Sequence, residues 1–367
     1  MSSAIGSVSA APVGSAAWKG GPILEKPVDI ATGAFVAVGS VGAVVRRKDD
    51  EMLLVRLGDR VTSLSDDGKL YARTRTLLID RGPASMAYWV SEGKLRRRLI
   101  DQEGKAGNIE TVADDAEEGF MPHGVRNEEG TSTAQDVVAY VGHKRSRDGE
   151  RQARVWVEGK GTSALSPEGT GAASTWVVPR GPGRLVIVWS DARAALTPLH
   201  AAPLELDGAG EPRLSPETTL WMGSPSESLA SLVGLRVDDT IVALTALPRD
   251  GLDFGLASVP VAFGAPPRDS AVWKLYPNGL DPAPVVPARL CGQPLVALVR
   301  PIERPVDSPR AIVLASVDAL GQVTERSEIA RAARVDHLTA WVSPRGDGWI
   351  GWVGDGRTKL RRVRCGK

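Results

Sequence analysis

The chain has 367 residues, with 45 basic and 44 acidic side chains and a formal net charge of +1 at pH 7. This balance excludes a generally cationic nucleic-acid-binding protein, although it leaves room for a local basic patch. The length exceeds what one ordinary core supports, so we expect two domains or a repeat architecture. The 40 glycines and 26 prolines predict many turns, and no apolar run approaches the roughly 18 residues of a membrane helix.

The first residues, MSSAIGSVSAAPVGSAAWKG, are small and polar. They lack the basic start and the leucine-rich stretch of a signal peptide. We therefore predict a disordered leader over residues 1–20 and a single domain over residues 21–367. Such a leader fits a cytoplasmic protein, and it equally fits a mature extracytoplasmic protein whose signal peptide has been removed, so the compartment stays open.

Seven β-rich, apolar stretches then follow at intervals of about 45 to 55 residues, a spacing typical of four-stranded propeller blades. An apolar stretch precedes each of them, and a turn, another strand and a shorter, more polar strand follow, with Gly, Asp or Pro between the strands. The pattern thus predicts four strands per unit. The seven stretches begin near Val41, Ser85, Asp136, Arg184, Thr240, Pro294 and Trp349.

One sequence motif, here called the repeated tryptophan phrase, occurs twice. WVVPRGPGRLVIVWSD begins at Trp176 and WVSPRGDGWIGWVGD begins at Trp341. We predict that the two tryptophans occupy matching places in the first strands of two units. Because stacked sheets need large flat side chains between them, packing is the expected role of most tryptophans in the chain. Trp349, close to a second tryptophan with a different facing, is the best candidate for contact with a ligand.

The whole pattern resembles divergent bacterial β-propeller repeat proteins. The ending Trp-Ser-Asp-Ala-Arg, residues 189–193, is similar to the W-x-D-x-R endings of divergent bacterial extracellular propeller repeats. The resemblance implies an all-β, soluble fold, namely a seven-bladed β-propeller of four-stranded blades. The alternative fold is a pair of β-sandwich domains, against which the regular spacing argues.

The seventh unit ends without a fourth strand, whereas the stretch GPILEKPVDI, residues 21–30, belongs to no other unit. We predict that residues from Pro22 to Asp29 pair with the strand around Lys359 to Arg364. An N-terminal strand would then complete the last blade, and it would cover an edge that otherwise invites aggregation.

No catalytic or metal-binding signature stands out. The histidines, His123, His143, His200 and His337, have no metal-ligand spacing, and neither a nucleophile elbow nor a P-loop occurs. We therefore predict no catalytic residue, no metal and no cofactor. Cys291 and Cys365 do not form a disulfide framework, and the sequence leaves open whether they form one bridge or stay as two semi-buried thiols.

Glycan chemistry is the sharpest enzymatic alternative. Sialidase-like propellers carry Asp-box turns, S-x-D-x-G-x-x-W, and the stretches SDDGKLY, SRDGERQ and SVDALGQ come close to that pattern. None of the three has both Asp and Gly in register. A glycan-binding or glycan-hydrolysing, sialidase-like propeller therefore stays the alternative function.

Basic residues alternate in the third strands of two units. Arg96 and Arg98 flank Arg97, and Arg362 and Arg364 flank Val363, so alternation directs each pair to one face of its sheet. These pairs are candidates for a basic sector that binds an anionic partner, and a solvated outer rim is the simpler interpretation. A long hairpin adds a candidate contact loop, made of His143, Lys144, Arg145 and Arg147.

The predicted function is non-enzymatic binding or scaffolding through one face of the ring. Propellers present loops from every blade around one channel mouth, which favours such a role. The expected partner is a protein or an anionic polymer such as an acidic polysaccharide, and nucleic acid is not expected.

Overall fold

The structure is a computed structural model. It describes residues 22–24, 26–31, 34–38, 44–48, 51–55, 61–65, 76–143, 151–167, 170–192, 198–222, 231–249, 253–266, 274–275, 286–302, 309–343 and 346–365. Over these ranges every regular element is a β-strand, which confirms the predicted all-β class. No helix with the length and apolar character of a membrane span is found among them. The predicted leader, residues 1–20, lies outside the described residues.

The described strands form seven antiparallel sheets, here numbered in chain order. Sheet 1 holds β3 (Ala34–Val38), β4 (Val44–Lys48), β5 (Glu51–Val55) and β6 (Val61–Ser63). Sheet 2 holds β7 (Thr76–Arg81), β8 (Ala84–Ser91), β9 (Lys94–Ile100) and β10 (Glu110–Ala113). Sheet 3 holds β11 (His123–Asn127), β12 (Gln135–His143), β13 (Arg151–Val157) and β14 (Gly161–Ala164).

Sheet 4 holds β15 (Ala172–Gly181), β16 (Arg184–Asp191), β17 (Leu199–Leu206), β18 (Pro212–Leu214) and β19 (Thr218–Trp221). Sheet 5 holds β20 (Ser231–Val237), β21 (Thr240–Arg249), β22 (Asp253–Pro260) and β23 (Lys274–Leu275). Sheet 6 holds β24 (Val286–Leu290), β25 (Gln293–Pro301), β26 (Arg310–Val317) and β27 (Val323–Ala332). Sheet 7 holds β28 (Val335–Val342), β29 (Gly348–Gly354), β30 (Arg357–Cys365), β1 (Pro22–Leu24) and β2 (Val28–Ala31).

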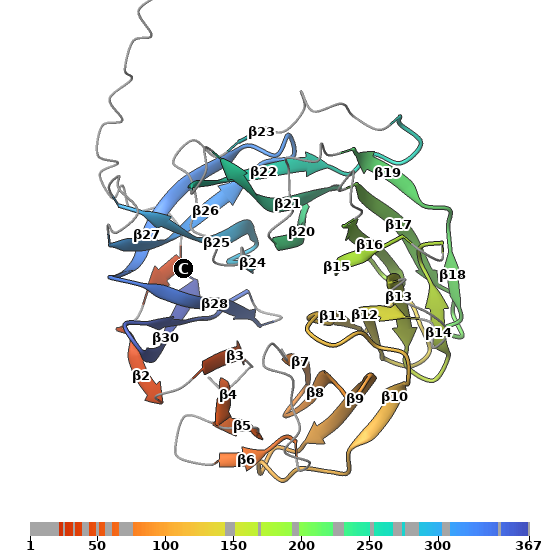
Figure 1. The fold of residues 1–367 in the computed structure, drawn as a ribbon, viewed down its shortest axis with the longest axis horizontal. Coiled ribbons are helices and arrows are strands. Elements are labelled where there is room, and N and C mark those ends of the chain that lie inside the picture. The colour runs from red at the N-terminus through yellow and green to blue at the C-terminus, as the bar shows by residue number, and fades with distance from the viewer. Residues whose placement is uncertain are drawn as a thin grey trace, which may run out of the picture.

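The sheets follow one another around a common centre (Figure 1). In each sheet the first strand lies nearest that centre and the last strand lies at the rim. The first strands of consecutive sheets contact one another all the way round, and β28 of sheet 7 contacts β3 of sheet 1. Each second strand begins within three residues of its predicted start.

The core lies between neighbouring sheets. Second strands such as β16, RLVIVWSD, are buried along almost their whole length, because each one is covered on both faces by the adjacent sheets. Such strands therefore read as continuous apolar runs rather than as an alternation. Trp89, Trp189 and Trp352 are fully buried in this core, in agreement with the packing role predicted for most tryptophans.

The first and last described strands of the chain pair in sheet 7. In β1, Ile23 pairs with Arg364 and Leu24 with Val363. In β2, Asp29 pairs with Lys359. Two short N-terminal strands thus lie along the outer edge of β30, where the sequence predicted an N-terminal partner, and they occupy the edge that the C-terminal strand would otherwise expose.

The repeated tryptophan phrase folds into two different hairpins. Trp176 pairs with Val188 in the middle of the β15–β16 hairpin, which closes at Gly181 and Arg184. Trp341 pairs with Trp349 beside the turn that joins β28 to β29. Both tryptophans lie in first strands, but the prediction that they occupy matching places is wrong.

The side chains at the two turns explain this difference. Ser343 donates a backbone hydrogen bond to the Asp347 carbonyl at 2.7 Å, and its hydroxyl donates to the Asp347 carboxylate. These bonds close a wide turn immediately after Val342. The aligned positions in sheet 4 are Val178 and Pro182, whose side chains cannot form the hydroxyl–carboxylate bond, and β15 continues to Gly181.

Three turns between third and fourth strands share an aspartate cap that the sequence analysis did not identify. They have the form D-x-x-G, with Asp101, Asp207 and Asp318 at the first position. In each, the aspartate carboxylate accepts a hydrogen bond at 2.7 to 3.0 Å from the backbone N–H four residues later. The stretch SVDALGQ therefore contains an aspartate-capped turn, which accounts for its near match to an Asp-box.

Candidate functional site

A row of two tryptophans and one arginine crosses sheet 7. Trp341 of β28, Trp349 of β29 and Arg362 of β30 are successive cross-strand partners, so their side chains share one face of the sheet. The opposite face, with Leu338, Trp352 and Val363, packs against sheet 6. The row therefore faces sheet 1, and we call it the tryptophan–arginine row.

The row is only partly covered. Trp341 and Trp349 are both half-buried, and they pack over the buried residues Val353 and Leu360. The guanidinium carbon of Arg362 lies 5.7 Å from the centre of the Trp349 ring, a distance suited to a cation–π contact. Two partly exposed tryptophans beside a cation are thus present on this face of sheet 7.

Carboxylates fix both ends of the row. The indole N–H of Trp341 donates a hydrogen bond to Asp80 of sheet 2. At the other end, Arg362 lies 3.6 Å from the carboxylate of Asp347, and 38% of its side chain is exposed. The hydrogen bond from Ser343, assisted by the charge of Arg362, holds the pKa of Asp347 below its usual value. Asp347 is therefore ionised at neutral pH and can orient Arg362.

The predicted alternation in β30 is present. Val363 is fully buried, whereas Arg362 is half-buried and Arg364 is exposed. The two arginines lie two positions apart in one strand, so they share a face. Sheet 7 thus brings together Arg362, Arg364 and the aromatic residue that the sequence singled out for ligand contact, Trp349.

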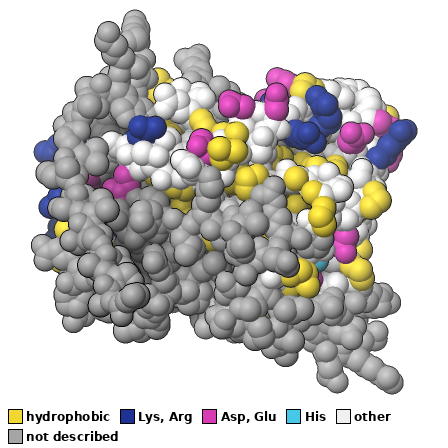
Figure 2. All heavy atoms as spheres, turned by 90° about the horizontal axis from the view of Figure 1, so that it is seen from above, with side chains coloured by type: hydrophobic (Ala, Val, Ile, Leu, Met, Phe, Trp, Pro, Cys, Tyr) yellow, Lys and Arg dark blue, Asp and Glu magenta, His cyan; other side chains and the backbone are white. Residues whose placement is uncertain are grey.

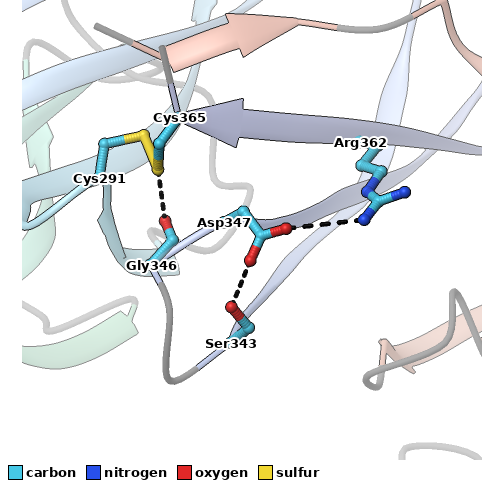
Figure 3. Close-up of a disulfide and its surroundings, with 6 residues drawn as sticks. All are labelled: Cys291, Ser343, Gly346, Asp347, Arg362 and Cys365. Carbon is cyan, nitrogen blue, oxygen red and sulfur yellow. Dashed lines mark hydrogen bonds and ion pairs between the residues drawn. A yellow bond between two sulfur atoms is a disulfide. The ribbon is translucent and has the colours of Figure 1, made fainter. Parts of the chain in front are cut away.

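A disulfide joins Cys291 to Cys365 beside the row (Figure 3). Their Cα atoms are 5.2 Å apart, and the bridge connects the turn between β24 and β25 to the last described residue of β30. The carbonyl oxygen of Gly346 accepts a hydrogen bond from the Cys291 backbone N–H at 2.6 Å and lies 3.3 Å from Sγ of Cys365. The question that the sequence left open is resolved in favour of a bridge.

The other predicted pair is engaged with its own protein. Arg98 donates to the Gly107 carbonyl at 2.6 Å and to the Ser63 carbonyl at 3.3 Å. Arg96 forms an ion pair with Glu92. Sheet 1 lies between this pair and the arginines of β30 (Figure 1), so the four arginines do not form one cluster.

Of the predicted contact loop, the structure describes only its first member. His143, the last residue of β12, lies 2.9 Å from the carboxylate of Glu117. Lys144, Arg145 and Arg147 lie outside the described residues. On the side of the ring visible in Figure 2, the described acidic, basic and hydrophobic side chains are interspersed, and no large area of one charge is visible.

The histidines lie apart from one another. His123 stacks on Trp176, with ring centres 3.5 Å apart, and its Nδ1 accepts the Val177 N–H at 3.0 Å. Burial lowers the pKa of His123 to about 3, so this ring is neutral. Among the described residues, no three His, Cys, Asp or Glu side chains are grouped as metal ligands would be.

A denser cluster of arginines and carboxylates joins sheets 2 and 3. Arg81 donates to Asp136 at 2.6 Å and to Glu158 at 2.7 Å, and the Tyr88 hydroxyl donates to Asp136 at 2.6 Å. Arg97 also donates to Glu158 at 2.7 Å. The set contains the residue types of a sialidase centre, which sequence reasoning did not locate because its members come from different strands.

The geometry of this cluster is that of a structural network. Asp136 and Tyr88 have no accessible surface, so no substrate can reach them. Burial alone would raise the pKa of Glu158, but hydrogen bonds from Arg81 and Arg97 outweigh burial and lower it. Burial and the charge of Asp136 raise the pKa of Tyr88. At neutral pH, Tyr88 is therefore protonated, and Glu158 is ionised and bound by two arginines.

No protein-family model and no curated protein matches this sequence. Among solved structures, the chain is similar to a neuraminidase-like protein of A/little yellow-shouldered bat/Guatemala, with 8% identity, a TM-score of 0.49, and coverage of 80% of this chain and 95% of that one. It is similar to Drosophila Semaphorin 2a, with 8% identity, a TM-score of 0.47, and coverage of 93% and 74%.

It is also similar to a mutant of Aleuria aurantia lectin in complex with Fucalpha1-6GlcNAc, with 9% identity, a TM-score of 0.45, and coverage of 82% and 96%. All three TM-scores lie below 0.5. These similarities by themselves assign neither a family nor an activity to the chain.

Proposed function

We propose that the seven sheets are the blades of a single β-propeller, closed where β1 and β2 pair with β30. The ring of contacts between first strands supports this fold, as does the pairing of both chain ends within sheet 7. In such a ring the turns between first and second strands gather at one face. The tryptophan–arginine row, which adjoins the turn after β28, then lies at the edge of that face.

We propose further that this propeller is a non-enzymatic binding protein and that the tryptophan–arginine row binds an acidic polysaccharide. The observation that carries this proposal is the half-buried Trp349 with the Arg362 guanidinium over its ring. The C–H face of a sugar ring can pack on the open part of an indole. A guanidinium donates two parallel hydrogen bonds to a carboxylate or a sulfate.

Arg364 extends the row toward a second anionic group. It is exposed and shares the Arg362 face of β30, so successive acidic units of a polymer can meet successive arginines. Asp347 neutralises part of the charge of Arg362 and orients its guanidinium. Binding at this site therefore depends on ordered contacts rather than on charge alone. We favour a polysaccharide over a protein because a repeating polymer presents its acidic groups at regular intervals, which suits two arginines two positions apart in one strand.

Binding of heparin, measured by fluorescence titration at low and physiological salt, tests this function. Trp349→Ala and the double variant Arg362→Gln/Arg364→Gln should each weaken binding about tenfold, a loss of about 1.4 kcal/mol. Raising the salt concentration should weaken binding of the wild type more than that of the double arginine variant.

The matched control is Arg96→Gln/Arg98→Gln, which removes the same charge from sheet 2. It should leave heparin binding within twofold of the wild type and lower stability instead, because Arg98 is bonded to backbone carbonyls. Equal loss of binding in the two double variants would mean that only overall charge matters. If the wild-type protein does not bind heparin but binds an acidic protein, the polysaccharide assignment is overturned.

We also propose an extracytoplasmic location for the protein. The support is the Cys291–Cys365 disulfide, because such bridges persist in oxidising compartments and are rare in the cytosol. Thiol labelling of protein isolated from its native cells tests this location. Free Cys291 and Cys365 in the isolated protein would contradict it.

A further inference from the structure

The disulfide is linked to the tryptophan–arginine row through one short turn. Gly346 contacts both halves of the bridge, by a hydrogen bond from the Cys291 N–H at 2.6 Å and by the 3.3 Å approach of its oxygen to Cys365 Sγ. The next residue is Asp347, whose carboxylate faces Arg362 (Figure 3). The turn that carries Asp347 is therefore held from sheet 6 as well as from its own strands.

The same bridge fixes the strand that carries the arginines. Cys365 follows Arg364 directly and ends the described part of β30. Its backbone pairs with Pro22 of β1, and its side chain adds a covalent link to Cys291, so the end of β30 is attached both to the N-terminal strand and to sheet 6. Without that link, backbone pairing with β1 and with β29 remains, and the pairing with β29 ends at Gly348 and Val363, two residues before Cys365.

We propose that the Cys291–Cys365 disulfide is the positioning element of the tryptophan–arginine row and that its reduction weakens ligand binding there. This inference rests on the proposed binding function. A dithiol reductant supplies two electrons and two protons, so that the bond between the two sulfurs breaks, two thiols form and the reductant becomes a disulfide. The turn at Gly346 then loses its anchor to sheet 6, and Asp347 no longer directs Arg362.

The disulfide is proposed to act on ligand binding through one arginine, Arg362. This distinguishes a positioning role of the disulfide from a general stabilisation of the fold. In the oxidised protein, Arg362 is aligned by Asp347, so Arg362→Gln removes a well-placed charge. In the reduced protein, Arg362 contributes little, so the same substitution has little further effect. If the bridge only stabilised the fold, its reduction would lower the melting temperature and leave the contribution of Arg362 to binding unchanged.

The experiment measures heparin affinity of the full chain in four forms, the wild type and Arg362→Gln, each oxidised and reduced with dithiothreitol. Reduction should weaken binding by the wild type about fivefold, in the range of ordinary coupling between sites, and should change binding by Arg362→Gln less than twofold. Circular dichroism confirms that each form is folded at the measuring temperature. Equal affinity of the oxidised and reduced wild type overturns the inference.

Ser343→Ala gives a second test that keeps the disulfide intact. It removes the hydroxyl that donates to the Asp347 carboxylate, so it should weaken heparin binding in the oxidised protein. If the reduced protein is unfolded, the heparin affinity of oxidised Ser343→Ala becomes the test. An affinity equal to that of the oxidised wild type would show that Asp347 does not direct Arg362, and it overturns the inference. Oxidised wild type that does not bind heparin at all would instead reject the proposed function.

Discussion

Trp189 and Trp349 place the same side chain in two different surroundings. Trp189 is fully buried between sheets 3 and 4, whereas Trp349 is half-buried at the edge of sheet 7. We expect Trp189→Ala to lower the free energy of unfolding by about 3 to 5 kcal/mol. Trp349→Ala should cost less, about 1 kcal/mol, because only part of this side chain is removed from water in the folded protein. Urea denaturation measures both, and equal losses would show that Trp349 is also a core residue.

Glu158 makes stability depend on pH. Its pKa in the folded protein lies below the usual 4.5, because the arginine hydrogen bonds outweigh burial. A carboxyl group with a lowered folded pKa stabilises the protein above its unfolded pKa, and this stabilisation is lost as the pH falls through the folded value. Glu158→Gln should therefore cost about 1 to 3 kcal/mol at pH 7 and less at pH 3.

The measurement is the free energy of unfolding in urea for both proteins at the two pH values. The difference in free energy of unfolding between wild type and Glu158→Gln should be smaller at the lower pH. An equal difference at the two pH values would mean that the charge of Glu158 is not what stabilises the contact between sheets 2 and 3.

At the scale of elements, the N-terminal strands cover the edge of β30. We expect removal of residues 1–19 to leave the melting temperature nearly unchanged, because it spares β1 and β2. Removal of residues 1–31 should lower the melting temperature by many degrees or make the protein insoluble, since it uncovers the backbone edge of the last sheet. Thermal denaturation of both truncated proteins checks this, and identical behaviour would place the seam of the ring elsewhere.

The turns show how element geometry follows from single side chains. Ser343 and Asp347 form a wide turn after β28, whereas Val178 and Pro182 allow β15 to run on. The shared letters Pro-Arg-Gly therefore do not decide where the strand ends. The residues on either side of them differ, and in sheet 7 they add a side-chain hydrogen bond across the turn.

At the scale of the whole molecule, the disulfide restricts the unfolded chain. Cys291 and Cys365 are 74 residues apart, and a loop of that length corresponds to a stabilisation of about 4 kcal/mol in the chain-entropy account. The double variant Cys291→Ser/Cys365→Ser should therefore unfold at a clearly lower urea concentration than the oxidised wild type. Equal midpoints for the two proteins would show that the reduced chain is already constrained.

Much of this fold could be predicted from the sequence. The spacing of apolar stretches located all seven second strands, and the surplus stretch at residues 21–30 pointed to the pairing with β30. The alternation of Arg362, Val363 and Arg364 predicted which side chains share a face. These features follow from residues close together in the chain, because strand alternation and turn chemistry are local properties.

The candidate site depended on tertiary structure. Arg98 and Arg362 occur in similar sequence patterns, but Arg98 meets backbone carbonyls of sheet 1 while Arg362 lies against Trp349. The partners of Arg81 and the pairing of Cys291 with Cys365 likewise join residues far apart in the chain. Such contacts depend on which sheets are neighbours and how their strands are offset, and no local pattern encodes that.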